Sequence, residues 1–114
     1  MFEPQIPVRD VTPAEAQALA EQGAVLVDVR EPYEWSAGHV AGSVHAPLGR
    51  LAASAVPADR TVVLVCRSGN RSRVAAELLL ASGHRDVVNL AGGLVAWDAA
   101  GLPLVTADAS SRTA

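Results

Sequence analysis

Lysine is absent from this chain, and cysteine, methionine, phenylalanine and tyrosine each occur once. All nine basic residues are therefore arginines, against twelve aspartates and glutamates, which gives a formal net charge of -3. A chain with this balance has no broad basic surface, so we expect no nucleic-acid partner. Aromatic residues make up only 4% although 50% of the residues are hydrophobic. The core must therefore consist mainly of valine, leucine and alanine.

The single cysteine, Cys66, excludes an internal disulfide, a two-cysteine redox pair and a zinc site built from several thiolates. No run of uncharged apolar residues approaches the roughly 18 to 20 that are needed to cross a bilayer. Residues 1–10 carry acids and two prolines rather than the basic and apolar regions of a signal peptide. We therefore expect a cytoplasmic protein that has no membrane partner, no metal and no cofactor.

The length of 114 residues suits one compact domain, which we place at residues 1–105, and we expect the small polar tail at 106–114 to be disordered. Apolar runs rich in β-branched residues predict strands at 24–29, 43–45, 61–65 and 87–90. Capping and periodicity signals predict helices at 12–23, 31–36, 48–55, 72–83 and 94–99. The first of these helices is predicted to begin with a capping box between Thr12 and Glu15. The alternation predicts an α/β fold with a mostly parallel sheet that is covered by helices on both faces.

Cys66 falls at the carboxyl end of the predicted strand 61–65, where ligands bind in parallel α/β sheets. The next seven residues contain Arg67, Arg71 and Arg73, and Gly69, which can adopt a positive φ in a tight loop. Successive backbone amides of such a loop form an anion-binding hollow together with the start of the next helix. A free cysteine taken alone is more often an inert core residue. In this setting a lowered thiol pKa is expected, and we predict that Cys66 is a nucleophile acting on an anionic substrate.

Two transfer reactions use a thiolate inside a loop of this kind, phosphoryl transfer and sulfur transfer. Four residues separate Cys66 from Arg71, whereas cysteine-dependent phosphatases carry one residue more. The shorter loop favours sulfur transfer and makes a phosphatase or arsenate reductase the less favoured enzyme class. A sulfur carrier or interaction module that serves a partner protein remains an alternative outside enzyme catalysis.

Four segments of the sequence resemble the single-domain rhodaneses and occur in the order of that family. They are residues 28–35 (DVREPYEW), 38–43 (GHVAGS), 65–72 (VCRSGNRS) and 90–97 (LAGGLVAW). The resemblance covers roughly residues 11–103. It implies a five-stranded, mostly parallel sheet flanked by helices on both faces, a six-residue active loop from Cys66 to Arg71, and sulfurtransferase activity.

The resemblance also implies roles for individual residues. Cys66 would accept the sulfur and act as the catalytic residue. Substrate binding would fall to the rest of the active loop, namely Arg67, Ser68, Gly69, Asn70 and Arg71. Supporting positions behind the loop would be Asp28, Arg30 and Ser72.

The implied reaction moves the outer sulfur of thiosulfate, or of another persulfide donor, onto Cys66 and then to cyanide or a thiol. The partners are therefore a small anionic sulfur donor and an acceptor, which a protein could also provide. Because the chain has no second cysteine, the Cys66 persulfide cannot resolve as an internal disulfide. The acceptor must come from outside the chain.

Overall fold

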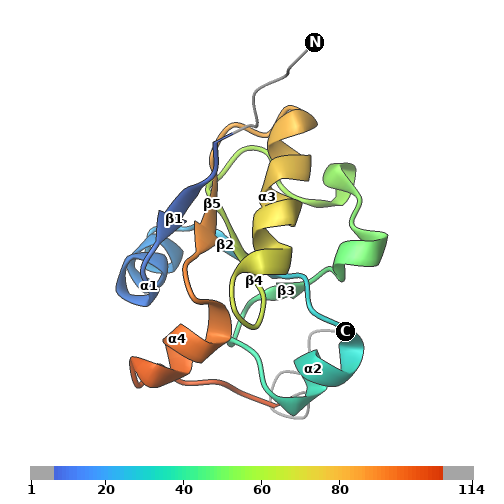
Figure 1. Ribbon diagram of the computed structural model, residues 1–114. Helices are drawn as coiled ribbons and strands as arrows, with labels where there is room; N and C mark the ends of the chain where they lie inside the picture. The colour runs from blue at the N-terminus through green and yellow to red at the C-terminus, as the bar shows by residue number, and fades with distance from the viewer. Residues whose placement is uncertain (1–6, 107–114) are drawn as a thin grey trace.

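The structure is a computed structural model that describes residues 7–106 (Figure 1). The predicted tail at 106–114 therefore lies outside the described residues, apart from Thr106. The strands form one sheet in the order β1-β5-β4-β2-β3, and each pair of neighbours is parallel. They are β1 (Arg9–Val11), β2 (Val25–Asp28), β3 (Val44–His45), β4 (Val62–Val65) and β5 (Val87–Leu90). The predicted α/β fold with a five-stranded parallel sheet is confirmed.

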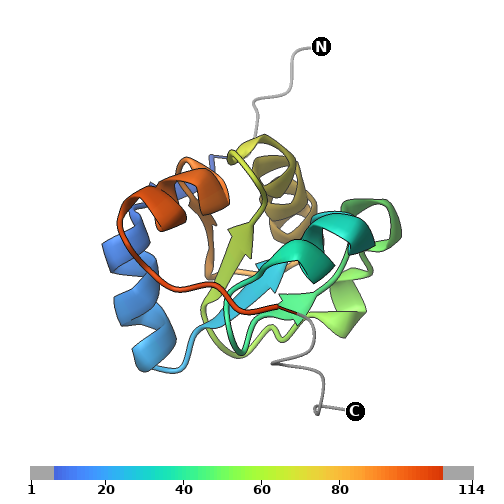
Figure 2. The same cartoon turned by 90° about the horizontal axis from the view of Figure 1, so that it is seen from below.

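Helices cover both faces of the sheet, as Figure 2 shows from below. On one face lies α3 (Asn70–Ala81), whose Leu79 is fully buried in the core cluster of that side. On the other face lie α1 (Pro13–Glu21) and α4 (Gly93–Ala99), and Trp97 of α4 is buried in the second cluster. The sheet therefore has a separate hydrophobic core on each side, as expected for a parallel sheet.

The central strand β4 contributes to both cores. Val62 and Leu64 pack in the α3 cluster, whereas Val63 and Val65 pack in the cluster of α1 and α4. Successive side chains of a strand point to opposite faces, so a strand covered on both sides consists entirely of apolar residues. This arrangement explains the uninterrupted run of valine and leucine that predicted the strand.

Helix α1 begins with the capping box that the sequence predicts. The amide of Glu15 donates to Thr12 Oγ1 at 3.1 Å, and the amide of Thr12 donates to Glu15 Oε1 at 2.8 Å. The chain then leaves the helix through Gly23, whose φ is +104°. The helix predicted at 31–36 is found as α2 (Pro32–Ala37).

Three elements differ from the prediction. The three-residue edge strand β1 is missed, because two of its residues are exposed and charged and give no apolar run. Residues 48–55 form two separate 3-10 turns, Leu48–Arg50 and Ala53–Ala55, because the backbone at Leu51 and Ala52 between them is extended, with ψ angles of 123° and 121°, which interrupts a helix. Helix α3 starts at Asn70, two residues before the predicted start at Ser72, because Gly69 provides the turn into it.

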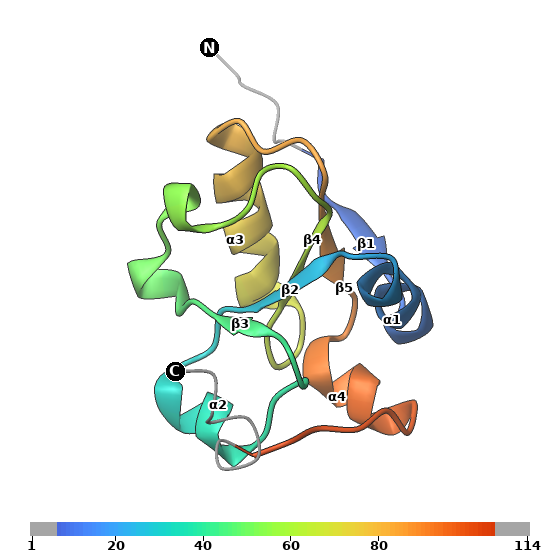
Figure 3. The same cartoon turned by 180° about the vertical axis from the view of Figure 1, so that it is seen from behind.

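The carboxyl ends of β2, β4 and β5 lie at the same edge of the sheet because the strands are parallel and adjacent. From this edge the chain enters α2, α3 and α4 respectively. Figures 1 and 3 show α2 and α4 at this same end of the molecule. The fold thus brings three segments that are distant in sequence around the residue that follows β4.

Candidate active site

Cys66 follows β4 directly and begins the loop that leads into α3. Its side chain is almost completely buried, with 1% of its surface exposed. The loop turns at Gly69, whose φ of +103° lies in the left-handed region that favours glycine. This turn allows the Gly69 amide to donate a hydrogen bond back to Cys66 Sγ at 3.0 Å. The loop therefore curls around the sulfur.

Helix α4 holds the loop from behind. The amide of Leu94 donates to the Cys66 carbonyl at 2.9 Å, and that of Val95 donates to the Arg67 carbonyl at 3.0 Å. Because the N–H and C=O of one peptide point in opposite directions, the amides that follow these carbonyls are turned away from α4. A Cβ at Gly93 would lie only 2.5 Å from the two carbonyl oxygens, so only glycine allows this close approach.

The hydrogen bonds at Cys66 favour ionisation of its thiol. Burial raises the pKa of Cys66, but hydrogen bonds from the Ser72 hydroxyl and from the amides of Ser72, Gly69 and Ser68 outweigh it. The pKa therefore lies below its ordinary value. Since the thiolate is the nucleophilic form of cysteine, the loop increases the share of Cys66 that is present in its nucleophilic form.

Arg71, in the first turn of α3, forms a bidentate ion pair with Glu34 of α2. The Nη1–Oε1 distance is 2.7 Å and the Nη2–Oε2 distance is 2.9 Å. The hydrogen bond from Arg71 lowers the pKa of Glu34 to about 2, outweighing the opposite effect of burial. The same hydrogen bond raises the pKa of Arg71. Arg71 is therefore one half of an ion pair rather than a free cation.

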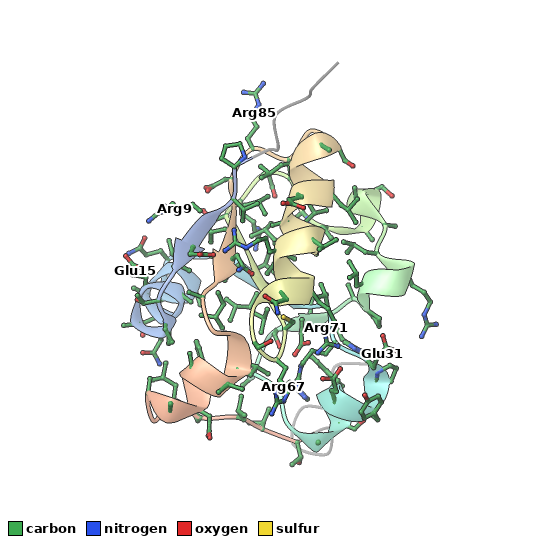
Figure 4. The ribbon with its side chains drawn as sticks, viewed as in Figure 1. Arg9, Glu15, Glu31, Arg67, Arg71 and Arg85 are labelled. Carbon is green, nitrogen blue, oxygen red and sulfur yellow. The ribbon has the colours of Figure 1, made fainter. Side chains whose placement is uncertain are left out.

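The other two arginines near Cys66 have different surroundings. Arg67 is exposed, and Figure 4 shows it with Arg71 at the end of α3 where the loop lies. Arg73 instead donates to both carboxylate oxygens of Asp10 on β1, at 2.6 and 2.7 Å. The charge of Arg73 is therefore matched at β1, an edge strand that the sequence did not reveal.

Comparison with known proteins identifies the family. A family model of the rhodanese-like domain matches residues 12–100. The chain belongs to this family. A Pseudomonas fluorescens protein named "Thiosulfate sulfurtransferase GlpE" is 40% identical over 89 residues, which are 76% of this chain and 82% of that protein. An uncharacterised Synechocystis protein is 44% identical over 98 residues, which are 83% of this chain but only 55% of that protein.

Solved structures agree with the rhodanese-like fold. A rhodanese-related protein from Thermoplasma volcanium superposes with a TM-score of 0.76 at 29% identity, covering 85% of this chain and 97% of that one. A Rhodopseudomonas palustris protein described as a possible tyrosine phosphatase gives a TM-score of 0.77 at 31% identity, covering 86% and 85%. The resemblance read from four sequence segments is thereby confirmed.

In this rhodanese-like domain, Asp28 and Arg30 form a buried ion pair at the carboxyl end of β2. Arg30 Nη2 lies 2.9 Å from Asp28 Oδ2 and 2.7 Å from the Gly38 carbonyl, which follows α2. Arg30 also contributes to the lowered pKa of Glu34. The pair therefore connects the carboxyl end of β2 to the residue that follows α2.

Ser72 lies closer to the sulfur than its expected supporting position suggests, with Oγ 3.3 Å from Cys66 Sγ. Ser68 and Asn70 are exposed, one on each side of the buried Gly69. Sequence reasoning missed Asn89, which contacts Ser72 from β5. A polar residue inside the apolar run of β5 was the signal that could have found it.

Over residues 7–106 the structure contains no group of three or more His, Cys, Asp or Glu side chains able to hold a metal ion. The helices of the same range include none that is long and apolar enough to cross a membrane. A surface hollow lined by residues 53–58 and 82–84 shares no residue with the Cys66 loop. We place the candidate chemistry at the loop, because the nucleophile and its donors are there.

Proposed function

We propose that this rhodanese-like domain is a sulfurtransferase with Cys66 as its nucleophile. The observation that carries the proposal is the buried Cys66 sulfur inside a loop whose amides donate hydrogen bonds to it. A persulfide on Cys66 would extend its charged terminal sulfur into the same set of donors, which stabilise an anion. The names of the sulfurtransferase relatives support the same class of reaction.

The first step is attack of the Cys66 thiolate on the outer sulfur of thiosulfate. A sulfur–sulfur bond forms at Cys66, the bond to the inner sulfur breaks, and its electron pair leaves with sulfite. In the second step cyanide, a thiolate or a protein acceptor attacks the terminal sulfur, and the Cys66 thiolate leaves. In each step the nucleophile supplies the electron pair of the new bond and the leaving group takes the pair of the broken bond, so neither step needs an external oxidant or reductant. We assign thiosulfate on the chemistry of the loop and on the names of the relatives.

We assign different roles to Arg67 and Arg71 in the binding of a dianionic donor. Arg67 is the exposed cation that we assign to donor recognition, with the amides of Ser68, Gly69 and Asn70. Arg71 keeps its charge opposite Glu34, and we assign to it the fixing of the loop as much as attraction of the donor. A nucleophile that must stay a free thiol suits a reducing compartment, so we place the protein in the cytoplasm.

A phosphatase is the second candidate, and the name of the Rhodopseudomonas palustris relative favours testing it. The decisive experiment treats the purified protein with thiosulfate, removes the excess and measures the intact mass beside a Cys66→Ser control. We expect one added sulfur atom in the parent alone, followed by its release as thiocyanate when cyanide is added. Absence of the adduct, together with turnover of an aryl phosphate that requires Cys66, would refute the sulfurtransferase and support the phosphatase.

The rate of sulfur transfer to cyanide distinguishes an enzyme from a sulfur carrier. A sulfur carrier would form the same adduct but pass it only slowly to cyanide and quickly to one partner protein. We expect repeated turnover with cyanide, measured as thiocyanate formed per mole of protein. A single turnover that stops at the persulfide would contradict the enzymatic proposal and favour the carrier.

A further inference from the structure

A chain of hydrogen bonds runs from Cys66 to the edge strand β1. Ser72 Oγ lies 3.3 Å from Cys66 Sγ and 2.5 Å from Oδ1 of Asn89 on β5. Asn89 Nδ2 lies 3.1 Å from Asp10 Oδ1 and 3.2 Å from the Gly69 carbonyl oxygen. Ser72 and Asn89 are at most 1% exposed, so solvent does not compete for their hydrogen bonds.

The bonding at Asn89 determines where the Ser72 proton lies. A carboxylate and a carbonyl only accept, so the Asn89 amide turns its NH2 group to Asp10 and Gly69 and its oxygen to Ser72. An amide oxygen has no proton to give, and the proton between these two oxygens therefore belongs to Ser72. A hydroxyl carries only one proton, so Ser72 cannot donate to Asn89 and to Cys66 at the same time.

We propose that Asn89 is a positioning residue that competes with Cys66 for the single proton of Ser72. When the sulfur is a thiol, Ser72 donates to Asn89 and its oxygen accepts the S–H of Cys66. When the sulfur is a thiolate, Ser72 turns its proton to the sulfur and leaves the buried Asn89 oxygen without a donor, which costs free energy. Asn89 therefore favours the protonated sulfur and opposes the amides of the loop.

Asp10 holds the Asn89 amide in the orientation that this competition requires. Oδ1 of Asp10 accepts hydrogen bonds from both Asn89 Nδ2 and Arg73 Nη2. Burial raises the pKa of Asp10, but the hydrogen bonds from Asn89 and Arg73 outweigh it, so the pKa is lowered and Asp10 remains an acceptor. The chain of bonds thus begins at a charged pair on the surface and ends at the nucleophile.

For sulfur transfer the consequence rests on the proposed function. A thiolate of lower pKa is a weaker nucleophile toward a donor, and it is a better leaving group when an acceptor removes the sulfur. By opposing ionisation, Asn89 keeps the Cys66 thiolate strongly nucleophilic in the first step and makes it a slower leaving group in the second. Asn89 is thus a determinant of the balance between loading and unloading.

The test is a titration of Cys66, which is the only cysteine of the chain, so its alkylation rate by iodoacetamide reports on one site. The effect of Asn89→Leu is measured twice. It is measured once against the parent protein and once in a protein that already carries Ser72→Ala. We expect Asn89→Leu to lower the midpoint of the alkylation–pH curve by about one pH unit, a tenfold change in ionisation. In the Ser72→Ala background we expect no change. An unaltered midpoint, or the same change in both backgrounds, would overturn the proposal.

The charged groups around the loop are the same in the parent, the two single variants of Asn89 and Ser72, and the double variant. They are the exposed Arg67, the Arg71–Glu34 pair between α3 and α2, the Asp10–Arg73 pair between β1 and α3, and the Asp28–Arg30 pair at the end of β2. A shift that depends on Ser72 therefore cannot come from a change in these charges.

A second pair of variants serves if Asn89→Leu does not fold. Asp10 is half-exposed, and Asp10→Asn removes its charge but keeps an oxygen for Asn89, whereas Asp10→Ala removes both. We expect a lower alkylation midpoint for Asp10→Ala than for Asp10→Asn, and equal midpoints would overturn the proposal. The titration needs no sulfur donor, so it stands even if the sulfurtransferase proposal fails.

The rates of the two half-reactions provide a further test once persulfide formation on Cys66 has been shown. With the sulfur fully ionised, Asn89→Leu should load sulfur from thiosulfate about threefold more slowly and should release it to cyanide faster. Slowing of both half-reactions by the same factor would mean that Asn89 is only structural and would overturn its positioning role.

Discussion

Replacing Glu34 with glutamine tests how much the ion pair beside the loop stabilises the fold. The Glu34 side chain is 13% exposed and the Arg71 side chain 37%. The pKa of Glu34 is lowered from 4.5 to about 2, so the ionised carboxylate stabilises the folded state relative to the unfolded chain. This lowering of the pKa corresponds to about 3 kcal/mol of stabilisation of the folded state. Solvent screening at the half-exposed Arg71 reduces the expected contribution to about 1–2 kcal/mol.

The sign of the pH dependence follows from the lowered pKa. The stabilisation by Glu34 is fully present above pH 4.5 and is lost as the pH falls toward about 2. At neutral pH, Glu34→Gln should therefore unfold with a free energy about 1–2 kcal/mol below that of the parent. In strong acid the two proteins should be equally stable, because the parent carboxyl is then protonated in both states.

The assay is urea unfolding at a series of pH values, followed by the fluorescence of Trp35 and Trp97. Glu21→Gln is the matched control, because it removes an exposed carboxylate at the end of α1, away from the Glu34–Arg71 pair. A stability difference between Glu34→Gln and its parent that persists unchanged into acid would refute the reasoning. The same would hold if the control reproduced the pH dependence.

Two further predictions concern the loop. Gly93→Ala should lower the free energy of unfolding by more than about 2 kcal/mol, because the new Cβ would lie 2.5 Å from loop carbonyl atoms at a φ of +58°. Gly101→Ala is the control, since a Cβ at Gly101 has open space. A melting temperature of Gly93→Ala equal to or above that of Gly101→Ala would contradict the prediction. Arg67→Ala should raise the KM for thiosulfate several-fold, most strongly at low ionic strength. Arg85→Ala removes an exposed arginine at the opposite end of the molecule (Figure 4) and should leave the KM nearly unchanged. Steady-state kinetics that give both variants the same KM would count against the assigned role of Arg67.

The parts of the fold that could be predicted are those whose signals are local. The apolar run of β4 and the capping box at Thr12 each lie within a few residues, and both are found as predicted. Strand β1 carries no such signal, since it is defined by its pairing with β5, of which Arg9↔Val88 is one register contact. An edge strand of three residues exists because a distant strand offers it hydrogen-bond partners. Its own sequence does not require it.

The candidate site divides in the same way. Gly69 and Ser72 lie within six positions of Cys66, so the sequence could place them near the sulfur. Glu34 is 37 positions from Arg71, and its role depends on how α2 lies against α3. The sequence therefore predicted the presence of an arginine in the loop but not the carboxylate that matches its charge.

Two polar residues inside apolar strands show how such partners could be anticipated. Asp28 ends the run of β2 and Asn89 interrupts the run of β5, and each is at most 1% exposed. A buried polar side chain needs a hydrogen-bond partner, so each residue implies another polar group near the same end of its strand. Because parallel strands bring their carboxyl ends to one edge, both partners must lie around the loop that follows β4. The polar positions of the strands therefore identify the surroundings of Cys66, although only the structure shows that Asn89 meets Ser72 and Asp28 meets Arg30.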